Sequence, residues 1–431
     1  MKTGELALLG GEPVREKPYP VHTTIIDDEE KKEVLEVISG GQLSGFSGRA
    51  GERFLGGEKV KELEGDFCKR YGIRFAVTFN SATSALHGSI SAAGIGPGDE
   101  VVTTPYTMSA SASCVLHNNA IPIFADIDPE TFCLDPESVK QRITHRTRAI
   151  MVVNLFGQPA ELEELNRIAH EHNLILIEDN AQSPGAFYKE KLAGTIGQMG
   201  ILSLNYHKTI QTGEGGVIIT NNEDLANRLR LVRNHGEVVL DDLGINNMVN
   251  MLGWNYRMTE LEAAIGKAQL RKLDFFNGHR QKLASVLTEA LKEFDFLTTP
   301  STRPGCTHVY YLYVLKFNET KLRIDRRTFA KALNAEGIPV DEGYVKPLYL
   351  MPMYQKRMAY GCDGCPFTCP YYSGRVNYDK GLCPVAERMY EKEVLTTNIC
   401  RYPNTEEDVV DFARAVRKIV DNLDKLRAYA K

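Results

Sequence analysis

The sequence lacks any run of about 18 or more apolar residues, the length that a helix needs to cross a membrane. Its opening residues, MKTGELALLGGEPVREK, also lack the apolar core of a signal peptide. We therefore expect a cytoplasmic protein without a membrane partner.

The chain also lacks a strong charge of either sign and a cysteine pattern typical of disulfides. A net charge of −5 over 431 residues gives no general signal for binding a polyanion, so we expect no nucleic-acid partner. The nine cysteines are an odd number scattered over a long chain, which indicates thiols. With 43% hydrophobic and 25% charged residues, the composition is that of an ordinary globular protein.

Short β-branched runs alternate with helical patterns from Phe75 onward. The runs are RFAVTFN, DEVVTTP, IPIFADI, RAIMVVNLF, LILIEDN, ILSLN and GGVIITN. This alternation predicts βαβ units and a mainly parallel sheet. Such a sheet binds its ligands at the carboxyl ends of its strands, so we expect the chemistry just after each run.

The texture changes beyond about Met258, where a long, charged, helically periodic segment begins. We expect an Asn-Gly break within it at Asn277 and Gly278. The pattern predicts a large domain of residues 1–258, including an N-terminal arm, and a small C-terminal domain of residues 259–431. Within the small domain, residues 350–384 are rich in Pro, Gly and Cys and predict an extended loop.

Four cysteines of this loop are spaced C-x2-C-x3-C-x13-C, at Cys362, Cys365, Cys369 and Cys383. Four thiolates could bind zinc, but the two-pair spacing of common zinc ribbons is absent. Cytosolic cysteine usually behaves as a small hydrophobe. We therefore expect free or packed thiols and no metal.

Two polar motifs follow predicted strands. FNSATSALHGSI places Ser81, Ala82 and Thr83 at the start of a helix, which suits either an anion or a simple N-cap. LILIEDNAQ ends an apolar strand with Asp179, followed by Gln182. A carboxylate there could be a metal ligand, a base, a partner for a protonated ring nitrogen, or only a loop cap.

Two further motifs complete the set. SLNYHKTIQTGEGG places Ser203 and Lys208 five residues apart across a turn, and MLGWNYRMTELEAAIG places Asn255 just before a helix. An isolated lysine is usually a solvated charge. Together, however, a lysine, a strand-end carboxylate and a helix N-terminus are what pyridoxal 5′-phosphate requires for its Schiff base, its pyridinium nitrogen and its phosphate.

The ordered stretches NSATSAL, GIGPGDEVVTTPYT, PIFADIDPETFCLDPE, LIEDNAQSPGA, SLNYHKTIQTGEGG, RLVRNHG, NYRMTELEAAIG and CPVAERMY resemble the DegT/DnrJ/EryC1/StrS sugar aminotransferases. The resemblance implies the α/β fold of aspartate aminotransferase, fold type I. That fold has a mainly parallel seven-stranded sheet flanked by helices and a smaller α+β C-terminal domain. It also implies pyridoxal 5′-phosphate and a homodimer with shared active sites.

Roles carry over from the resemblance residue by residue. Lys208 resembles the Schiff-base lysine and Asp179 the partner of the pyridinium nitrogen, so these two are the expected catalytic residues. The other expected cofactor contacts are Gln182 near the 3-hydroxyl, Ser81, Ala82, Thr83 and Ser203 at the phosphate, and Asn255 at the phosphate of the neighbouring subunit. Met108 stands where many members stack an aromatic ring on the cofactor, and it either packs on that ring or belongs to the core.

The resemblance implies transfer of an amino group from L-glutamate, or L-glutamine, to a keto sugar, and a nucleotide-linked keto-deoxysugar is the expected acceptor. The alternatives are a cofactor-dependent sugar dehydratase, an aminotransferase acting on a cyclitol ketone such as an inosose, and a non-catalytic relative. Some related dehydratases have a histidine in place of the lysine. Here the spacing from Ser203 falls on Lys208, which favours transamination and leaves His207 pointing elsewhere.

Weaker candidates for substrate contacts come from loops that border the matched motifs. They are Tyr106, Thr107, His235 and Tyr344. The two tyrosines would serve equally well in packing at an interface.

Overall fold

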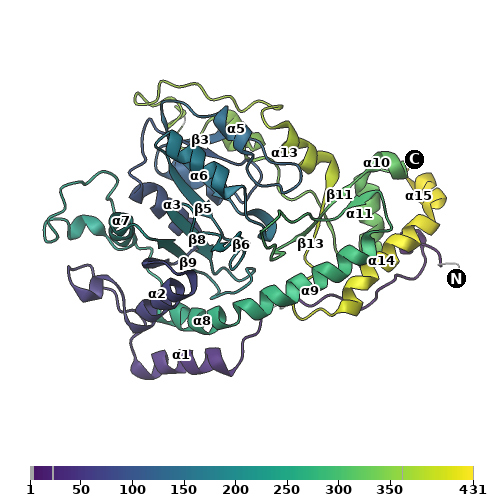
Figure 1. The fold of residues 1–431 in the computed structure, drawn as a ribbon, viewed down its shortest axis with the longest axis horizontal. Helices are drawn as coiled ribbons and strands as arrows, with labels where there is room; N and C mark the ends of the chain where they lie inside the picture. Colours follow the sequence, from purple (N-terminus) through teal and green to yellow (C-terminus); the bar gives the residue numbers. More distant parts are fainter. Residues whose placement is uncertain (1–3, 22–23, 362, 431) are drawn as a thin grey trace.

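The computed structural model describes residues 4–21, 24–361 and 363–430 (Figure 1). A seven-stranded sheet forms its centre, in the order β1-β9-β8-β5-β4-β2-β3. Only β9 runs antiparallel to its neighbours. The predicted mainly parallel α/β sheet is therefore confirmed. The strands are β1 (Phe75–Phe79), β2 (Glu100–Thr103), β3 (Ile121–Phe124), β4 (Thr147–Val153), β5 (Ile175–Asp179), β8 (Met199–Ser203) and β9 (Gly216–Thr220).

Helices cover both faces of this sheet, because successive side chains of each strand point to opposite sides. In β1, Val77 packs with apolar residues of α3, α4 and α7, whereas Ala76 packs with those of α2 and α8. The helices are α2 (Glu58–Tyr71), α3 (Ala82–Ala92), α4 (Ala110–His117), α5 (Pro136–Lys140), α6 (Leu162–Glu171), α7 (Glu223–Arg233) and α8 (Glu260–Arg271). A hairpin of β6 (Phe187–Tyr188) and β7 (Lys191–Leu192) adds a small second sheet.

A smaller α+β unit follows, built on a four-stranded antiparallel sheet in the order β10-β11-β13-β12. Tyr313, Leu315, Phe329 and Phe412 are buried in its core. Its strands are β10 (Leu297–Thr298), β11 (Tyr313–Phe317), β12 (Asp341–Glu342) and β13 (Val394–Thr397). Its helices are α9 (Leu273–Leu291), α10 (Glu319–Leu322), α11 (Arg326–Ala335), α14 (Glu406–Asp421) and α15 (Leu423–Tyr429).

The packing of three segments does not follow the predicted boundary at residue 258. Leu6 of the N-terminal arm is buried in the core of the smaller unit, and the amides of Ala7 and Val14 donate to Glu336. In Figure 1 both chain ends accordingly lie at the end of the molecule that holds α15. Helix α8, by contrast, packs on α2 and on α1 (Asp28–Gly40), with the large sheet.

The Cys-rich loop of residues 350–384 is the third such segment. It includes α12 (Pro352–Lys356) and leads into α13 (Pro384–Arg388). Tyr378 packs on Phe124 of β3, and its hydroxyl donates to the carbonyl of Pro122 at 2.6 Å. The predicted boundary places this loop in the smaller domain, but these contacts attach it to the large sheet, and in Figure 1 the loop passes over β3.

The cysteines of this loop differ in how deeply they are buried. Cys383 is buried, whereas Cys365 and Cys369 are half-buried; Cys362 lies outside the described residues. Among the residues that the structure describes, no three His, Cys, Asp or Glu side chains gather where a metal could bind. In the same part of the chain, no helix is both long and apolar enough to span a membrane.

The predicted helix break at Asn277 and Gly278 is wrong. Helix α8 ends at Arg271, and α9 runs without interruption from Leu273 to Leu291. Asn277 faces inward and its side-chain amide donates to the carbonyl of Pro184 at 2.9 Å. The bend therefore falls at Lys272, where the chain passes from packing on α1 and α2 to packing on α14.

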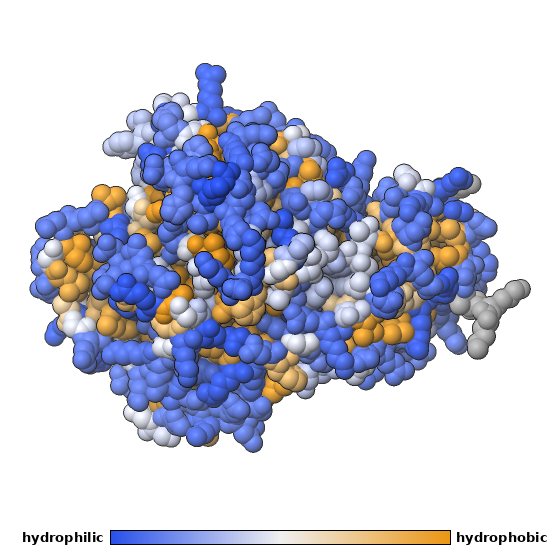
Figure 2. All heavy atoms as spheres, viewed as in Figure 1, coloured by the Kyte–Doolittle hydropathy of each residue, from blue (hydrophilic) through white to orange (hydrophobic). Residues whose placement is uncertain are grey.

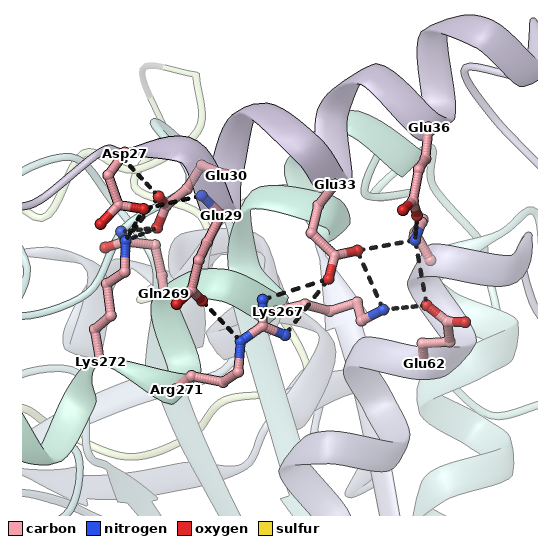
Figure 3. A network of polar contacts seen from close by, with 11 residues as sticks. Asp27, Glu29, Glu30, Glu33, Glu36, Glu62, Lys267, Gln269, Arg271 and Lys272 are labelled. Carbon is pink, nitrogen blue, oxygen red and sulfur yellow. Dashed lines mark hydrogen bonds and ion pairs between the residues drawn. The ribbon is translucent and has the colours of Figure 1, made fainter.

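Helix α1 is held against α2 and α8 by ion pairs (Figure 3). Lys272 contacts both Glu30 oxygens at 2.8 Å, and Glu30 is only 2% exposed. Further along, Lys59 contacts Glu33 at 2.8 Å, and Glu33 also pairs with Lys267 at 3.3 Å. Carboxylates of α1 therefore face lysines that α2, α8 and the end of α8 present, and these ion pairs help to hold α1 against the domain.

Candidate active site

A cleft with about 650 Å³ of empty space opens where β5, β8 and the start of α3 meet. This is the edge at which the sequence predicted the chemistry. The predicted residues that line the cleft are Ser81, Ala82, Thr83, Thr107, Met108, Asp179, Gln182, Ser203 and Lys208, and His207 lines it too. The fold thus brings three of the four predicted motifs together, although Ser81 and Lys208 are more than a hundred residues apart in sequence, and it leaves the motif of Asn255 outside the cleft.

Asp179, the last residue of β5, presents a buried carboxylate to the cleft. Its Oδ2 accepts a hydrogen bond from the Ser111 hydroxyl at 2.7 Å, and its Oδ1 accepts from the Ala181 amide at 3.2 Å. Burial raises the pKa of Asp179, and these hydrogen bonds and the charge of Lys208 act against that rise. A cation placed beside it would favour the carboxylate form.

Lys208 lies in the turn between β8 and β9. The turn is tight because the Tyr206 amide donates to the Gly213 carbonyl at 2.8 Å, where Gly213 has a φ of +85° that favours glycine. Lys208 is half-buried, and its Nζ lies 3.5 Å from the Tyr311 hydroxyl. Burial lowers the pKa of Lys208 to about 8, although the Asp179 carboxylate opposes the change. The amine is therefore easily made neutral and nucleophilic.

The N-terminus of α3 forms the opposite end of the cleft. Ser81 caps the helix by accepting from the Ser84 amide at 3.0 Å, while the amides of Ala82 and Thr83 donate to no group among the described residues. Free amides at a helix start bind anions. A Cβ on Gly216 of β9 would lie 2.6 Å from the Ala82 nitrogen, so only glycine lets the two segments approach this closely.

Comparison with known proteins identifies this arrangement. The model of the DegT/DnrJ/EryC1/StrS aminotransferase family matches residues 25–378. The chain belongs to this family. GDP-perosamine synthase of Caulobacter vibrioides is 34% identical over 82% of this chain and 93% of its own length. L-glutamine:2-deoxy-scyllo-inosose aminotransferase of Streptomyces kanamyceticus is 34% identical over 99% of this chain and 100% of its own.

A solved structure shows the same fold. GDP-4-keto-6-deoxymannose-3-dehydratase superposes with a TM-score of 0.74 at 26% identity, covering 92% of this chain and 99% of that one. The predicted family, aminotransferase activity and fold type I architecture are confirmed. The cofactor of this aminotransferase is pyridoxal 5′-phosphate, also as predicted.

The cleft of this aminotransferase fits that cofactor. Lys208 supplies an amine of lowered pKa, and Asp179 supplies a buried hydrogen-bond acceptor for a protonated ring nitrogen. The amides of Ala82 and Thr83 are without acceptors among the described residues and line the same cleft as the buried Ser203, so this end of the cleft suits a phosphate. The cleft therefore offers suitable groups for the aldehyde, the ring nitrogen and the phosphate of the cofactor.

Met108 and Gln182 line the cleft on its other sides. Met108 is 59% exposed, so its side chain is available to a ligand and is not part of the core. The Gln182 Oε1 accepts from the Phe156 amide and its Nε2 donates to the Tyr344 hydroxyl, both at 2.9 Å. These two bonds fix the side chain of Gln182 in one orientation.

The weaker substrate candidates fall in different places. Tyr106 is fully buried and packs edge-on against Tyr344 with ring centroids 5.8 Å apart, so it is a core residue and does not line the cleft. Tyr344 reaches the site through Gln182, and Thr107 lines the cleft. His235 follows α7 in a left-handed turn with φ of +52°, and it is not among the lining residues.

Asn255 and His207 contact neighbours in their own segments. Asn255 is exposed and accepts a hydrogen bond from Arg257 at 2.8 Å, away from the lining residues. His207 lines the cleft but packs edge-on against Tyr206 with centroids 5.1 Å apart. Burial and the charge of Lys208 lower the pKa of His207, which favours its neutral form.

Three residues that shape this site were not predicted from the sequence. Ser111 lies inside α4, where its pattern indicates only a helix, and Tyr311 precedes a strand of the other unit. Gly216 is one of several glycines in GEGG and nothing in the motif distinguishes it. Their roles arise from contacts between segments that are distant in the chain.

Proposed function

We propose that this aminotransferase moves an amino group from L-glutamate, or L-glutamine, to a nucleotide-linked keto-deoxysugar. The observation that supports it is the placing of a lysine of lowered pKa and a buried carboxylate in one cleft, beside the anion-binding start of α3. GDP-perosamine synthase, a relative over most of the chain, favours the nucleotide-linked acceptor.

Each residue has a proposed task. When bound, pyridoxal phosphate supplies a carbonyl that takes up an amino group and a ring that accepts electrons. Lys208 Nζ binds the cofactor covalently and moves a proton at the substrate carbon once an incoming amine has released it. Asp179 holds a proton on the ring nitrogen, and Met108 covers one face of the ring.

The remaining proposed contacts orient the cofactor. The amides of Ala82 and Thr83, with the hydroxyls of Ser81 and Ser203, bind the phosphate. Gln182 donates from its Nε2 toward the 3-hydroxyl side. Thr107 and His207, which line the cleft, are proposed substrate contacts, and Tyr344 is proposed through its bond to Gln182. His235 stays a weaker proposal, because among the described residues it neither lines the cleft nor contacts a residue that does.

A cyclitol ketone is the second candidate acceptor. The relative named for 2-deoxy-scyllo-inosose matches 99% of this chain, at the same 34% identity as the perosamine enzyme. A dehydratase is the third candidate, favoured by the likeness to GDP-4-keto-6-deoxymannose-3-dehydratase. The amine of Lys208 argues for transamination, because a proton-moving lysine is what amino transfer needs.

We also propose a homodimer in which Asn255 completes the site of the neighbouring subunit. The loop after α7 exposes large apolar side chains close to Asn255 in sequence, among them Leu252 at 77% and Trp254 at 51% exposed. Figure 2 shows hydrophobic side chains gathered at the same end of the molecule. Such a patch suits a protein interface. The scattered thiols further suit a reducing compartment, and we propose the cytoplasm.

The absorption spectrum of the purified protein with pyridoxal phosphate tests the function. We expect a band from the lysine-bound cofactor that L-glutamate converts to the amine form, and that a nucleotide-linked keto sugar restores. Restoration by scyllo-inosose alone would identify the cyclitol acceptor. A band that no amino acid changes would exclude transamination and favour elimination or a non-catalytic relative. Lys208→Ala should lose the band altogether.

A further inference from the structure

One carboxylate of the cleft has no task in the proposed chemistry. Glu214 lies in the turn between β8 and β9 and lines the same cleft as Lys208 and Asp179. Its side chain is exposed, and among the described residues no lysine, arginine or histidine forms an ion pair with it. The carboxylate therefore faces the place of the substrate with its charge uncompensated.

A neighbouring side chain holds this carboxylate in one orientation. The Asn205 Nδ2 donates to both oxygens of Glu214, at 3.0 and 2.9 Å. Asn205 is itself tied to the part of the turn that faces the cofactor, because its backbone amide donates to Ser203 Oγ at 3.4 Å. Its carbonyl also accepts from the Lys208 amide at 2.9 Å. These contacts set the place of Glu214 relative to Lys208.

The glycines on either side of Glu214 fix its backbone. The Leu204 amide donates to the Gly215 carbonyl at 2.9 Å, and the Thr212 hydroxyl donates to the Glu214 carbonyl. A Cβ on Gly215 would lie 2.6 Å from that hydroxyl, so glycine is favoured there. Gly213, on the other side, has a φ of +85° that also favours glycine. The GEGG turn thus presents one carboxylate from a fixed backbone, as a specificity contact requires.

A histidine ring accompanies the carboxylate. His207 lines the same cleft, and its backbone amide donates to Asn205 Oδ1 at 3.4 Å. A neutral imidazole both donates and accepts hydrogen bonds, whereas a carboxylate only accepts them. Glu214 and His207 together therefore offer more acceptors than donors to a ligand in the cleft.

The charge of Glu214 narrows the choice of ligand. An amino-acid donor carries a carboxylate and a sugar nucleotide carries phosphates, and a carboxylate repels both groups. Hydroxyl groups donate to a carboxylate in strong, charge-assisted hydrogen bonds. A carboxylate has about four lone-pair sites, so Glu214 can accept from two neighbouring hydroxyl groups in addition to Asn205.

We propose that Glu214, oriented by Asn205, binds ring hydroxyl groups of the keto acceptor and so selects polyhydroxylated acceptors. This inference rests on the proposed function. It applies equally to a nucleotide-linked keto sugar and to a cyclitol ketone, because both carry hydroxyl groups on the ring that bears the ketone. The amino-acid donor has no such groups and does not use this contact.

Spectral titration of the protein loaded with the amine form of the cofactor tests the contact, with Glu214→Gln as the variant. Glutamine keeps an oxygen for Asn205 but loses the charge. The acceptors are scyllo-inosose and GDP-4-keto-6-deoxymannose, measured separately. For the acceptor that the wild type uses, we expect the apparent Kd to rise at least about tenfold. An unchanged Kd would overturn the inference.

Glu190→Gln is the matched control for the loss of charge. Glu190 is exposed in the turn between β6 and β7 and does not line the cleft. This variant should leave the apparent Kd of the acceptor unchanged. An equal rise in both variants would mean that the net charge of the protein, and not a contact of Glu214, sets acceptor affinity, and the inference would be wrong.

Two substrates without ring hydroxyl groups separate the contact from general damage to the cleft. The apparent Kd for L-glutamate should not rise in Glu214→Gln, because removing a negative charge does not weaken a donor that carries two carboxylates. Cyclohexanone, a ring ketone without hydroxyl groups, should react equally with the variant and the wild type. A tenfold rise for either substrate would overturn the inference.

Sedimentation velocity shows whether Glu214 serves an interface between subunits instead. Glu214→Gln and the wild type should sediment as the same species. Dissociation of the variant alone would assign the carboxylate to a subunit contact, and the inference would be wrong.

Calorimetry with unreactive probes distinguishes failure of this contact from failure of the proposed function. The probes are scyllo-inositol and GDP-mannose, which carry ring hydroxyl groups but no ketone, added to the cofactor-loaded protein. If Glu214→Gln weakens their binding at least tenfold while no amino acid changes the cofactor band of the wild type, the hydroxyl contact stands and the proposed function fails. If amino transfer proceeds and the variant binds both probes as the wild type does, the proposed function stands and this inference fails.

Discussion

At the scale of single residues, the pKa of Lys208 decides how readily its amine reacts with the cofactor. Because burial lowers its pKa to about 8, the neutral amine that attacks the cofactor is present above that pH. Cofactor uptake by the cofactor-free protein should therefore quicken with pH around a midpoint near 8. Stopped-flow absorbance measures this, and a midpoint near 10.5, the ordinary lysine value, would contradict it.

The Asp179→Asn variant tests the electrostatic coupling between Asp179 and Lys208. The carboxylate of Asp179 opposes the lowering of the Lys208 pKa, so its removal should move the midpoint of uptake further down. The variant should still bind cofactor through the α3 amides, but turnover should fall by about 100-fold or more, as when a stabilising charge is removed from an active site. Near-normal turnover would remove the role proposed for Asp179.

These two residues could be predicted from the sequence because each follows a recognisable apolar strand. Ser111 could not be predicted, because it lies in a helix 68 residues from the carboxylate to which it donates. Tyr106 shows the opposite case, since a tyrosine in a matched loop proved to be fully buried. Side-chain direction depends on tertiary packing, and local pattern does not report it.

At the scale of elements, the approach of β9 to the start of α3 shapes the phosphate end of the cleft. Gly216→Ala would place a Cβ 2.6 Å from the Ala82 nitrogen, so strand or helix must move. We expect at least about a tenfold rise in the Kd for pyridoxal phosphate, equivalent to about 1.4 kcal/mol, from the disturbed amides. Fluorescence titration measures it.

Gly278→Ala is the control for that change. A Cβ at Gly278 meets nothing within 4 Å, and the residue lies inside α9. Alanine should therefore stabilise the protein by about 1 kcal/mol and leave cofactor affinity unchanged. Equal cofactor affinity in Gly216→Ala and the wild type would show that the close approach does not matter.

The ion pairs under α1 make a prediction about stability. Glu30 accepts from Lys272, from Gln269 at 2.7 Å and from the Asp27 amide at 2.9 Å, all while almost fully buried. Glu30→Ala leaves these donors unpaired and should lower the free energy of unfolding by about 2–4 kcal/mol in urea.

Glu36→Ala serves as the comparison, because Glu36 is exposed and, among the described residues, forms an ion pair with Lys59 alone. Its loss should cost less than about 1 kcal/mol, as for surface ion pairs. An equal loss of unfolding free energy in the two variants would mean that the burial of Glu30 does not increase its contribution to stability.

Most strands and helices could be predicted from periodicity, but the bend between α8 and α9 could not. The Asn-Gly pair suggested a break at residue 278, yet α9 buries Asn277 against Pro184 and continues. The packing partners of the two helices set the bend at Lys272 instead. A weak local preference of about 1 kcal/mol for breaking a helix is overridden by such contacts.

At the scale of the whole molecule, segments far apart in sequence cross between the two units. The arm reaches Glu336 and Lys418 of the smaller unit, where Lys418 and Glu336 form a buried pair at 2.8 Å. The 350–384 loop returns to β3 through Tyr378. The sequence pattern changes near residue 258, from alternating strands and helices to a long charged helical segment. This change does not tell which surface a later segment covers when the chain returns.

The proposed dimer makes the last prediction, because a shared site and a separate site differ in what mixed subunits can do. Lys208→Ala and Asn255→Ala should each be nearly inactive. If Asn255 serves the partner's cleft, a heterodimer of the two variants has one site with both residues intact. Random exchange of equal amounts makes half of the dimers mixed, so about one quarter of wild-type activity should return.

Lys208→Ala mixed with Asp179→Asn is the control: both residues line the cleft of one chain, so no heterodimer has an intact site and activity should stay absent. Recovery in the control, or none with Asn255→Ala, would mean that Asn255 does not complete the partner's site.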